Sequence, residues 1–262
     1  MCAAPPSFLA LPWQQLTKFT GEVYTVRECL ESLRAMPNLT ECAFGVSSLE
    51  DDTEVFSHPN IQHFNVLGCS HLAAGAASAD ILGHVTLPAL RTLKIKDVVD
   101  FNHWTLDLFL LRSAAPLRKL VICPYEVVGN EFTEVILSDT FFTLRLTELE
   151  IWDPSNLFLP LLFDSIAQDA NALPRLRNLS FRGCDFGTSG MTVGAVIDEA
   201  ALPVTQRRHL AGCAQLQSFH LVAGRRDVAL DTVFSEARLL PFKKLKESGM
   251  DIYIGTENSS VI

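Results

Sequence analysis

Histidine and cysteine are the residues of this chain best able to bind a metal or carry catalysis, and their spacing indicates neither. The seven histidines form no H-E-x-x-H motif, and the seven cysteines contain no C-x-x-C pair. Neither a G-x-S-x-G nucleophile element nor a phosphate-binding P-loop occurs. Cys69 and His71 lie two residues apart, but a metal site would need two further ligands. We therefore expect no metal, no cofactor and no enzymatic activity.

The charge and hydropathy of the chain exclude two classes of partner. Thirty acidic residues against 21 basic ones give a net charge of −9, which disfavours nucleic acid. No apolar run approaches the roughly 18–20 residues that span a bilayer, and the N-terminal MCAAPPSFLALPW lacks the basic residues of a signal peptide. We expect a soluble cytoplasmic chain, with the nucleus as an alternative, that binds neither nucleic acid nor membrane.

The elements that must position any binding residue come from an internal repeat. The pattern L-x-x-L-x-L, with apolar substitutes, recurs through the chain at intervals of 22 to 40 residues. The mean interval of about 29 residues is typical of long leucine-rich repeats. The nine copies begin at Leu16, Leu39, Ile61, Leu90, Leu117, Leu146, Leu176, Leu216 and Gly249.

Each copy predicts a short strand followed by a helix. A proline ends the segment before several copies, and apolar residues at helical spacing predict helices over 25–33, 104–112 and 158–167. The first two intervals, 23 and 22 residues long, predict units too short for full helices. The end units are expected to act as caps.

Positions 4 and 6 of each copy share one face of the strand, as Leu93 and Ile95 do, and should point toward the helices. One unit cannot bury such residues alone, so neighbouring units stack. The sequence predicts an α/β leucine-rich-repeat solenoid of about nine repeats, with a parallel concave sheet and helices on the convex side. Residues 1–15 form an N-terminal cap or extension, and residues 16–262 form the solenoid.

A glycine-rich segment, FRGCDFGTSGMTVGAVIDEA, is the nearest approach to a cofactor-binding loop. Its glycines at 187, 190 and 194 are spaced G-x-x-G-x-x-x-G, whereas a dinucleotide site uses G-x-G-x-x-G. The segment lies in the longest repeat interval. We therefore predict a flexible insertion around residues 184–215, of the kind that often extends a binding face. Cys69 and Cys184, eight residues after the starts of their copies, are expected to be buried turn residues.

The phrases LPWQQLTKF, ECLESLRAMPNLTECAF, VTLPALRTLKI, FLLRSAAPLRKLVI and LPRLRNLSF resemble the leucine-rich-repeat regions of F-box proteins, especially the divergent fungal families. The resemblance runs from about Leu11 to Gly224. It implies a substrate receptor that recruits a protein to a cullin-type ubiquitin ligase. Only fifteen residues precede Leu16, and they do not predict the helical F-box. The ligase link is therefore expected only if an F-box lies upstream.

The side chains at positions 3, 5 and 7 should face away from the core, onto the concave sheet. A basic group and an acidic pair are predicted to lie side by side there, with an exposed Trp and an Arg that suit a protein-binding hot spot. An alternative is that Lys119 and Glu148 simply pair with each other on a solvated face. The candidate residues are Lys94, Lys96, Lys119, Glu148, Glu150, Trp152 and Arg182.

Function is therefore predicted to be protein recognition without chemistry of its own. The first hypothesis is an interaction module resembling the substrate-recognition repeats of an F-box ubiquitin-ligase adaptor. The alternative is a free-standing leucine-rich-repeat scaffold or inhibitor unrelated to ubiquitination. An enzyme would need convergent acid and base residues, which the motifs do not supply.

Overall fold

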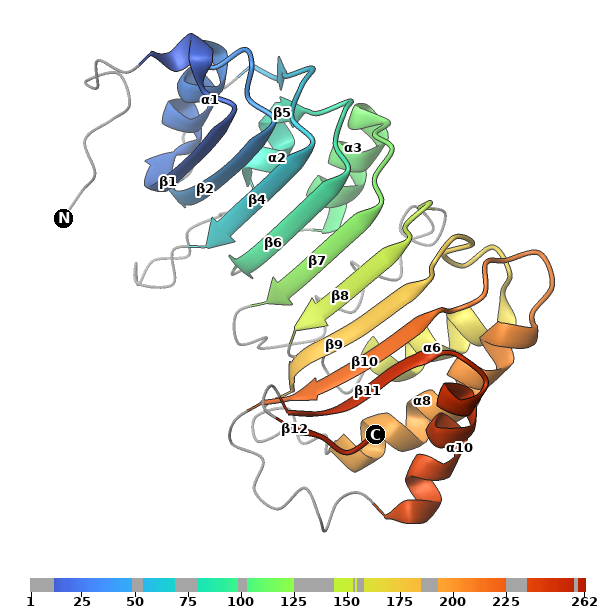
Figure 1. Ribbon diagram of the computed structural model, residues 1–262. Coiled ribbons are helices and arrows are strands. Elements are labelled where there is room, and N and C mark those ends of the chain that lie inside the picture. Colours follow the sequence, from blue (N-terminus) through green and yellow to red (C-terminus); the bar gives the residue numbers. More distant parts are fainter. Residues whose placement is uncertain are drawn as a thin grey trace. The chain divides into compact units, whose positions relative to one another are not determined.

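The computed structural model describes residues 12–48, 54–68, 80–98, 103–124, 144–152, 154, 158–184, 193–224, 235–256 and 259–262. The chain divides into two compact units, Met1–Val135 and Ile136–Ile262, and each is described by itself. In both units the strands of a sheet lie beside one another and helices pack on the sheet (Figure 1).

In the first unit the strands of the larger sheet run parallel in the order β1-β2-β4-β6-β7. A short parallel pair, β3 with β5, forms a separate sheet. The strands are β1 (Lys18–Thr25), β2 (Glu41–Ser48), β3 (Phe56–Ser57), β4 (His63–Gly68), β5 (Val85–Thr86), β6 (Thr92–Val98) and β7 (Lys119–Pro124). The helices are the 3-10 turn η2 (Trp13–Gln15), α1 (Val26–Ala35), α2 (Ile81–His84) and α3 (His103–Ser113).

The second unit repeats this plan. Strands β8 to β11 are parallel neighbours in sequence order, and β12 returns antiparallel to β11. Helix α8 packs against both α6 and α10. The elements are β8 (Glu148–Trp152), α6 (Phe158–Gln168), β9 (Asn178–Cys184), α8 (Val193–His209), β10 (Ser218–Ala223), α10 (Glu236–Glu247), β11 (Asp251–Thr256) and β12 (Ser259–Ser260).

The predicted strand positions are confirmed. Each of the nine copies of the pattern supplies a strand that begins two residues after the first residue of the copy. Third residues of successive copies are register partners within each unit, so the ladders stay in phase with the repeat. These partners are Lys18, Glu41, His63, Thr92 and Lys119 in the first unit, and Glu148, Asn178, Ser218 and Asp251 in the second.

The predicted core positions are also confirmed. Positions 4 and 6 of the four central copies are no more than 3% exposed, and each large side chain buried in this way contributes roughly 1.5–3 kcal/mol. In the second unit a row of aromatic rings crosses the core from α6 through β9 and β10 to α10. The ring-centroid distances are 5.6 Å for Phe163–Phe181, 6.1 Å for Phe181–Phe219 and 5.4 Å for Phe219–Phe242.

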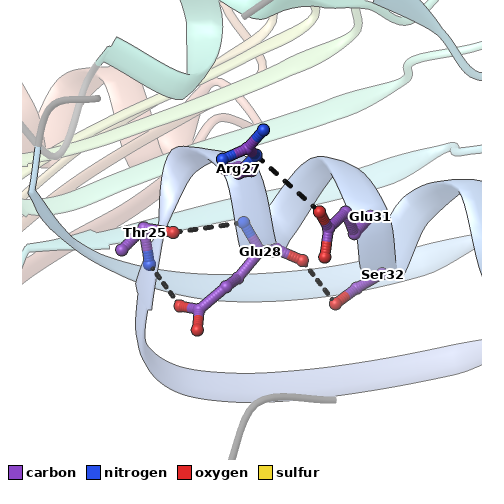
Figure 2. A network of polar contacts seen from close by, with 5 residues as sticks. All are labelled: Thr25, Arg27, Glu28, Glu31 and Ser32. Carbon is purple, nitrogen blue, oxygen red and sulfur yellow. Dashed lines mark hydrogen bonds and ion pairs between the residues drawn. The ribbon is translucent and has the colours of Figure 1, made fainter. Parts of the chain in front are cut away.

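Helix α1 corrects the prediction that the first interval is too short for a full helix. The ten-residue helix follows β1 directly, with no intervening turn. Thr25 serves both elements, because it ends the strand and caps the helix (Figure 2). Its Oγ1 accepts a bond from the Glu28 amide at 3.2 Å, and the Glu28 carboxylate accepts one from the Thr25 amide at 2.8 Å. Because Thr25 is both the last residue of the strand and the N-cap of the helix, no loop residues are needed between β1 and α1.

We expect Thr25→Ala to lower the free energy of unfolding by about 1 kcal/mol, because it removes the cap of α1. Arg27→Ala is the matched control on the same helix turn. The Arg27–Glu31 pair is 3.9 Å long and both side chains are more than half exposed, so its loss should cost at most about 0.5 kcal/mol. Urea unfolding of both variants measures the difference, and equal losses would contradict the capping role.

In the first unit, Arg112 and His58 form hydrogen bonds with backbone carbonyls at the C-terminal ends of neighbouring helices. Arg112, at the end of α3, donates through Nη2 to the carbonyls of Leu82 and Val85 at 2.6 and 2.7 Å. These carbonyls close the end of α2, where intrahelical partners run out. Burial lowers the pKa of Arg112. His58 likewise places Nε2 at 3.0 Å from the carbonyl of Met36, the C-cap of α1. These bonds join two pairs of neighbouring repeats.

Part of the insertion predicted around residues 184–215 is helical. Residues 193–209 form α8, whose buried Val196, Ile197, Ala200 and Val204 face the core. The glycines at 187 and 190 lie outside the described residues, as does Cys69. Cys184 is the last residue of β9. The apolar residues at helical spacing therefore decide the conformation of the second half of this interval.

Helix α3 has apolar residues on two faces. Leu106 and Phe109 are buried, whereas Trp104, Leu108 and Leu111 are 65%, 56% and 74% exposed. The exposed three are spaced i, i+4 and i+7, so they share one face of the helix. This outer face was not anticipated from the sequence, because an apolar helix does not reveal which side faces the core.

Candidate functional site

The outward faces of the two sheets hold the predicted site residues. Along β8 the side chains alternate between half-buried and buried. Positions 3, 5 and 7 of the repeat pattern, counted from its first residue Leu146, therefore lie on the face opposite the core. The strand geometry therefore places Glu148, Glu150 and Trp152 on one surface of the second unit. In the first unit, Lys94 and Lys96 take positions 5 and 7 of the copy that contains β6. Lys119 takes position 3 of the copy that contains β7.

In the second unit three predicted residues form one contact cluster, Glu150–Trp152–Arg182. Trp152 and Arg182 are register partners on β8 and β9. The indole Nε1 of Trp152 donates to Glu150 Oε1 at 2.9 Å, and Arg182 Nε lies 3.1 Å from the same oxygen. The Arg182 Nε–H is not aligned for a hydrogen bond, so this contact is an ion pair. One carboxylate thus orients both an aromatic ring and a guanidinium.

Within the cluster, the carboxylate of Glu150 is less exposed to solvent than its partner Arg182. The Glu150 side chain is 17% exposed, whereas that of Arg182 is 40% exposed. A carboxylate shielded from water holds its partners more strongly than one in bulk solvent. The arrangement therefore fixes the orientation of Trp152 and Arg182 while leaving part of the guanidinium accessible.

Two further pairs of outward side chains in the second unit join neighbouring strands. Ser218 Oγ donates to Asn178 Oδ1 at 2.9 Å. On the next pair of strands, His220 Nε2 lies 2.9 Å from Asp251 Oδ2, and its ring packs edge-on against Tyr253. Asp251 and Tyr253 were missed in the sequence-based selection. They occupy positions 3 and 5 of the last copy, so extending the rule used for the other copies would have found them.

In the first unit three lysines lie on two adjacent strands. Lys94 and Lys96 are register partners of Val121 and Cys123, and Lys119 is the register partner of Thr92. All three lysines are half-buried. Val121 and Cys123 are only 4% and 6% exposed, so the outward face at these two positions is covered. These two positions therefore offer little surface to a partner.

At the far edge of the same sheet an ion pair joins β1 and β2. Lys18 Nζ lies 2.7 Å from Glu41 Oε2, across the first register pair of the two strands. The hydrogen bond from Lys18, its charge and the nearby His63 lower the pKa of Glu41. Glu41 is therefore engaged by Lys18 and separated from the lysines of β6 by strand β4.

The predicted site residues consequently fall into two groups. Glu150, Trp152 and Arg182 are in contact, with Glu148 two residues before Glu150 on the same face. Lys94, Lys96 and Lys119 lie together on the first unit. The predicted pairing of Lys119 with Glu148 would join the two units and remains a prediction.

Within the described parts of the chain, no three His, Cys, Asp or Glu side chains are placed to hold a metal ion. Burial raises the pKa of the Cys42 thiol well above its usual value, so this thiol remains protonated and unreactive. Among those same residues, none of the helices combines the length and apolar character needed to cross a membrane.

Comparison with protein-family models, with curated proteins and with solved structures finds no match to this chain.

Proposed function

We propose that this protein is a non-enzymatic interaction module that binds another protein on the outward faces of its sheets. The observation that carries the proposal is the Glu150–Trp152–Arg182 cluster on the outward sheet face of the second unit, where all three residues are half-buried rather than fully exposed. Trp and Arg are the residue types most enriched in binding hot spots. A half-buried carboxylate that holds both in place also lowers the entropy lost when a partner binds.

The proposed architecture is a curved leucine-rich-repeat solenoid of about nine repeats, with these faces on its concave side. This proposal is supported by the agreement between the repeat pattern and the strands, since every copy of the pattern has a strand that begins two residues after its first residue. Parallel strands, helices on one side and stacked apolar positions are what such repeats require.

The proposed role is substrate recognition like that of the repeats of F-box ubiquitin-ligase adaptors, supported by the resemblance of the repeat phrases. A free-standing scaffold or inhibitor is the second candidate, because the sheet faces would serve it equally well. Mapping the 5′ end of the transcript separates the two. An in-frame F-box upstream of Met1 favours the adaptor and a cullin-type ligase as partner, whereas a transcript that begins at Met1 favours the scaffold.

The binding face is tested by the combined variant Lys96→Ala, Trp152→Ala, Arg182→Ala. We expect it to fold normally, since none of the three side chains lies in the core, and to bind its partner at least about 30-fold more weakly. That loss corresponds to about 2 kcal/mol, the threshold for a hot spot. Binding is measured by interferometry with the partner identified by cross-linking and mass spectrometry.

A control variant with the same residue types is Lys244→Ala, Trp104→Ala, Arg175→Ala. These three side chains are exposed and lie outside the two sheet faces. We expect the control to bind like the unaltered protein. Full-strength binding by the sheet-face variant would show that the partner uses another surface.

A further inference from the structure

Helices α6, α8 and α10 of the second unit each carry one exposed leucine. The helices lie on one side of the sheet, and α8 packs between the other two (Figure 1). Leu161, Leu202 and Leu240 are 43%, 63% and 47% exposed. In the described part of this unit, the large apolar side chains that are exposed are these three and Val261. We call Leu161, Leu202 and Leu240 the leucine row.

All three leucines lie on the outer face of their helices. Two residues turn a helix by about 200°, so a leucine two positions from a core residue lies on the opposite side. The residue two positions after each leucine is buried, and these core residues are Phe163, Val204 and Phe242. The leucine row therefore faces away from the sheet.

Contacts between the helices place the three leucines at the same level. Polar contacts join residues 40 apart near both ends of α8 and α10, and 41 apart between α6 and α8. Leu161 and Leu202 are 41 residues apart, and Leu202 and Leu240 are 38 apart. These offsets agree within one helical turn, so the row runs across the helix axes. The contacts are Asp198–Arg238 at 3.1 Å, Arg208–Ser248 at 3.0 Å and Arg207–Ile166 at 3.1 Å.

Acidic side chains border the leucine row on α6 and α8. Asp164 lies one turn after Leu161, and Glu199 lies one turn before Leu202. Both side chains are exposed. In the part of the chain that the structure describes, neither side chain takes part in a hydrogen bond or an ion pair. Their negative charge is therefore available to a ligand.

The charges on α10 beside the row have a different character. Lys243 pairs with Glu236 at 3.3 Å, and Lys244 is an exposed base one turn after Leu240. A ligand that crosses the row therefore meets negative charge over α6 and α8, but not over α10.

A helix that crosses the row matches its spacing. Packed helices are about 8–10 Å apart, so the three leucines recur at about that distance. Residues seven apart in a helix lie on one face and are separated by about 10.5 Å. Apolar residues at positions i, i+7 and i+14 of a ligand helix therefore meet the three leucines in turn.

The apolar surface of the row suits one helix better than a second copy of the chain. The exposed fractions amount to about one and a half leucine side chains, on the order of 100–200 Å². A stable interface buries roughly 800 Å² on each partner, with an apolar centre. The row supplies only a small part of that area.

We propose that the leucine row is a second protein-binding surface, separate from the sheet faces, which binds an amphipathic helix of a partner protein. Apolar side chains of the ligand, seven residues apart, lie against Leu161, Leu202 and Leu240. Lys or Arg side chains beside the first two lie against Asp164 and Glu199.

The test uses a fluorescein-labelled peptide of sequence Lys-Leu-Lys-(Ala)4-Lys-Leu-Lys-(Ala)4-Gln-Leu-Gln, whose binding is followed by fluorescence anisotropy. We expect binding at least about tenfold weaker in the variant Leu161→Ala, Leu202→Ala, Leu240→Ala, because it removes the apolar contacts. A second peptide exchanges the central leucine with the alanine two positions later. This exchange keeps the composition and charge but moves the leucine to the other side of the helix, and it should weaken binding at least about fivefold.

The control variant is Trp104→Ala, Leu108→Ala, Leu111→Ala, which removes comparably exposed apolar side chains from α3 of the first unit. It should bind the first peptide within about twofold of the unaltered protein. The charge contribution is tested by Asp164→Asn, Glu199→Gln. This variant should bind more weakly and lose most of the salt dependence seen between 50 and 200 mM salt.

No binding of the first peptide, equal binding of the two peptides, or equal weakening by both alanine variants would overturn the inference. A dimer of the unaltered chain that the row variant abolishes, measured by light scattering, would also overturn it, since a second copy would then be the occupant. Circular dichroism melting checks each fold. If the triple row variant does not fold, Leu202→Ala replaces it, with binding expected to be about threefold weaker.

The outcome is independent of the proposed function. The sheet-face variant Lys96→Ala, Trp152→Ala, Arg182→Ala should bind the first peptide like the unaltered protein. Weakening by the sheet-face variant as large as by the row variant would show that the peptide does not bind at the leucine row.

Discussion

Leu120→Asp is expected to abolish the cooperative folding of the first unit. Leu120 lies on β7 at position 4 of its repeat copy. It is completely buried and in register with the equally buried Leu93. An aspartate there places an unpaired carboxylate among aliphatic side chains and also leaves a cavity. We expect a loss of more than about 4–5 kcal/mol, which matches the total stability of many domains. Thermal melting followed by circular dichroism measures the loss.

Arg91→Asp is the matched control for this substitution. It introduces the same side chain at position 2 of the preceding copy, where the residue is exposed. The expected change is within about 0.5 kcal/mol. An unchanged melting temperature for Leu120→Asp would show that the assignment of inward and outward positions along the repeat is wrong.

Arg207→Met is expected to cost about 3 kcal/mol in the second unit, although it replaces a charged residue by an apolar one of similar length. Arg207 is completely buried in α8. Its guanidinium donates to the carbonyls of Ile166, Asp169 and Leu173 at 3.1, 3.3 and 2.8 Å. The methionine would remove three hydrogen bonds from a charged donor, each worth roughly 1.5–3 kcal/mol, although the carbonyls of Asp169 and Leu173 would still accept bonds from the amides of Ala172 and Leu176. Removal of the cost of burying a charge offsets part of this loss.

One of the three carbonyls bound by Arg207 belongs to a residue with a strained backbone. Leu173 adopts a φ of 48°, in the left-handed region that costs a residue other than glycine roughly 1–2 kcal/mol. The short bond from Arg207 Nη2 to the Leu173 carbonyl helps to hold this conformation. Burial lowers the pKa of Arg207, with the nearby Cys213 and Asp169 opposing the shift.

The neighbouring Arg208→Met is the control. Arg208 donates to the side chain and the carbonyl of Ser248 at an exposed site, so its loss should cost less than about 1 kcal/mol. Urea unfolding of both variants tests the comparison. Equal effects at 207 and 208 would show that the three carbonyl bonds do not stabilise the fold.

The strands and their buried faces could be predicted from the alternation of apolar and polar residues. Positions 4 and 6 of each copy lie on the same face of a strand, and their apolar side chains indicate that this face covers a core. The same rule placed Glu150, Trp152 and Arg182 on one surface. It could not foresee that one carboxylate oxygen contacts both partners, since that depends on side-chain torsions rather than on spacing.

Other features depended on interactions that spacing does not encode. Helix α1 fits a short interval because Thr25 belongs to the strand and also caps the helix. The burial of Arg207 arises from carbonyls about forty residues away in sequence. The outward but buried Val121 shows that strand alternation predicts the face of a residue and not its exposure.

The central claim is that the outward sheet faces bind a protein partner, and site-directed photo-crosslinking tests it most directly. The crosslinking amino acid p-benzoylphenylalanine replaces Trp152 on the sheet face in one variant and the 65%-exposed Trp104 on α3 in another. Both changes retain an aromatic side chain, and the illuminated samples are analysed by mass spectrometry. The account predicts a specific adduct from position 152 and none from position 104. An adduct from position 104 alone would contradict it.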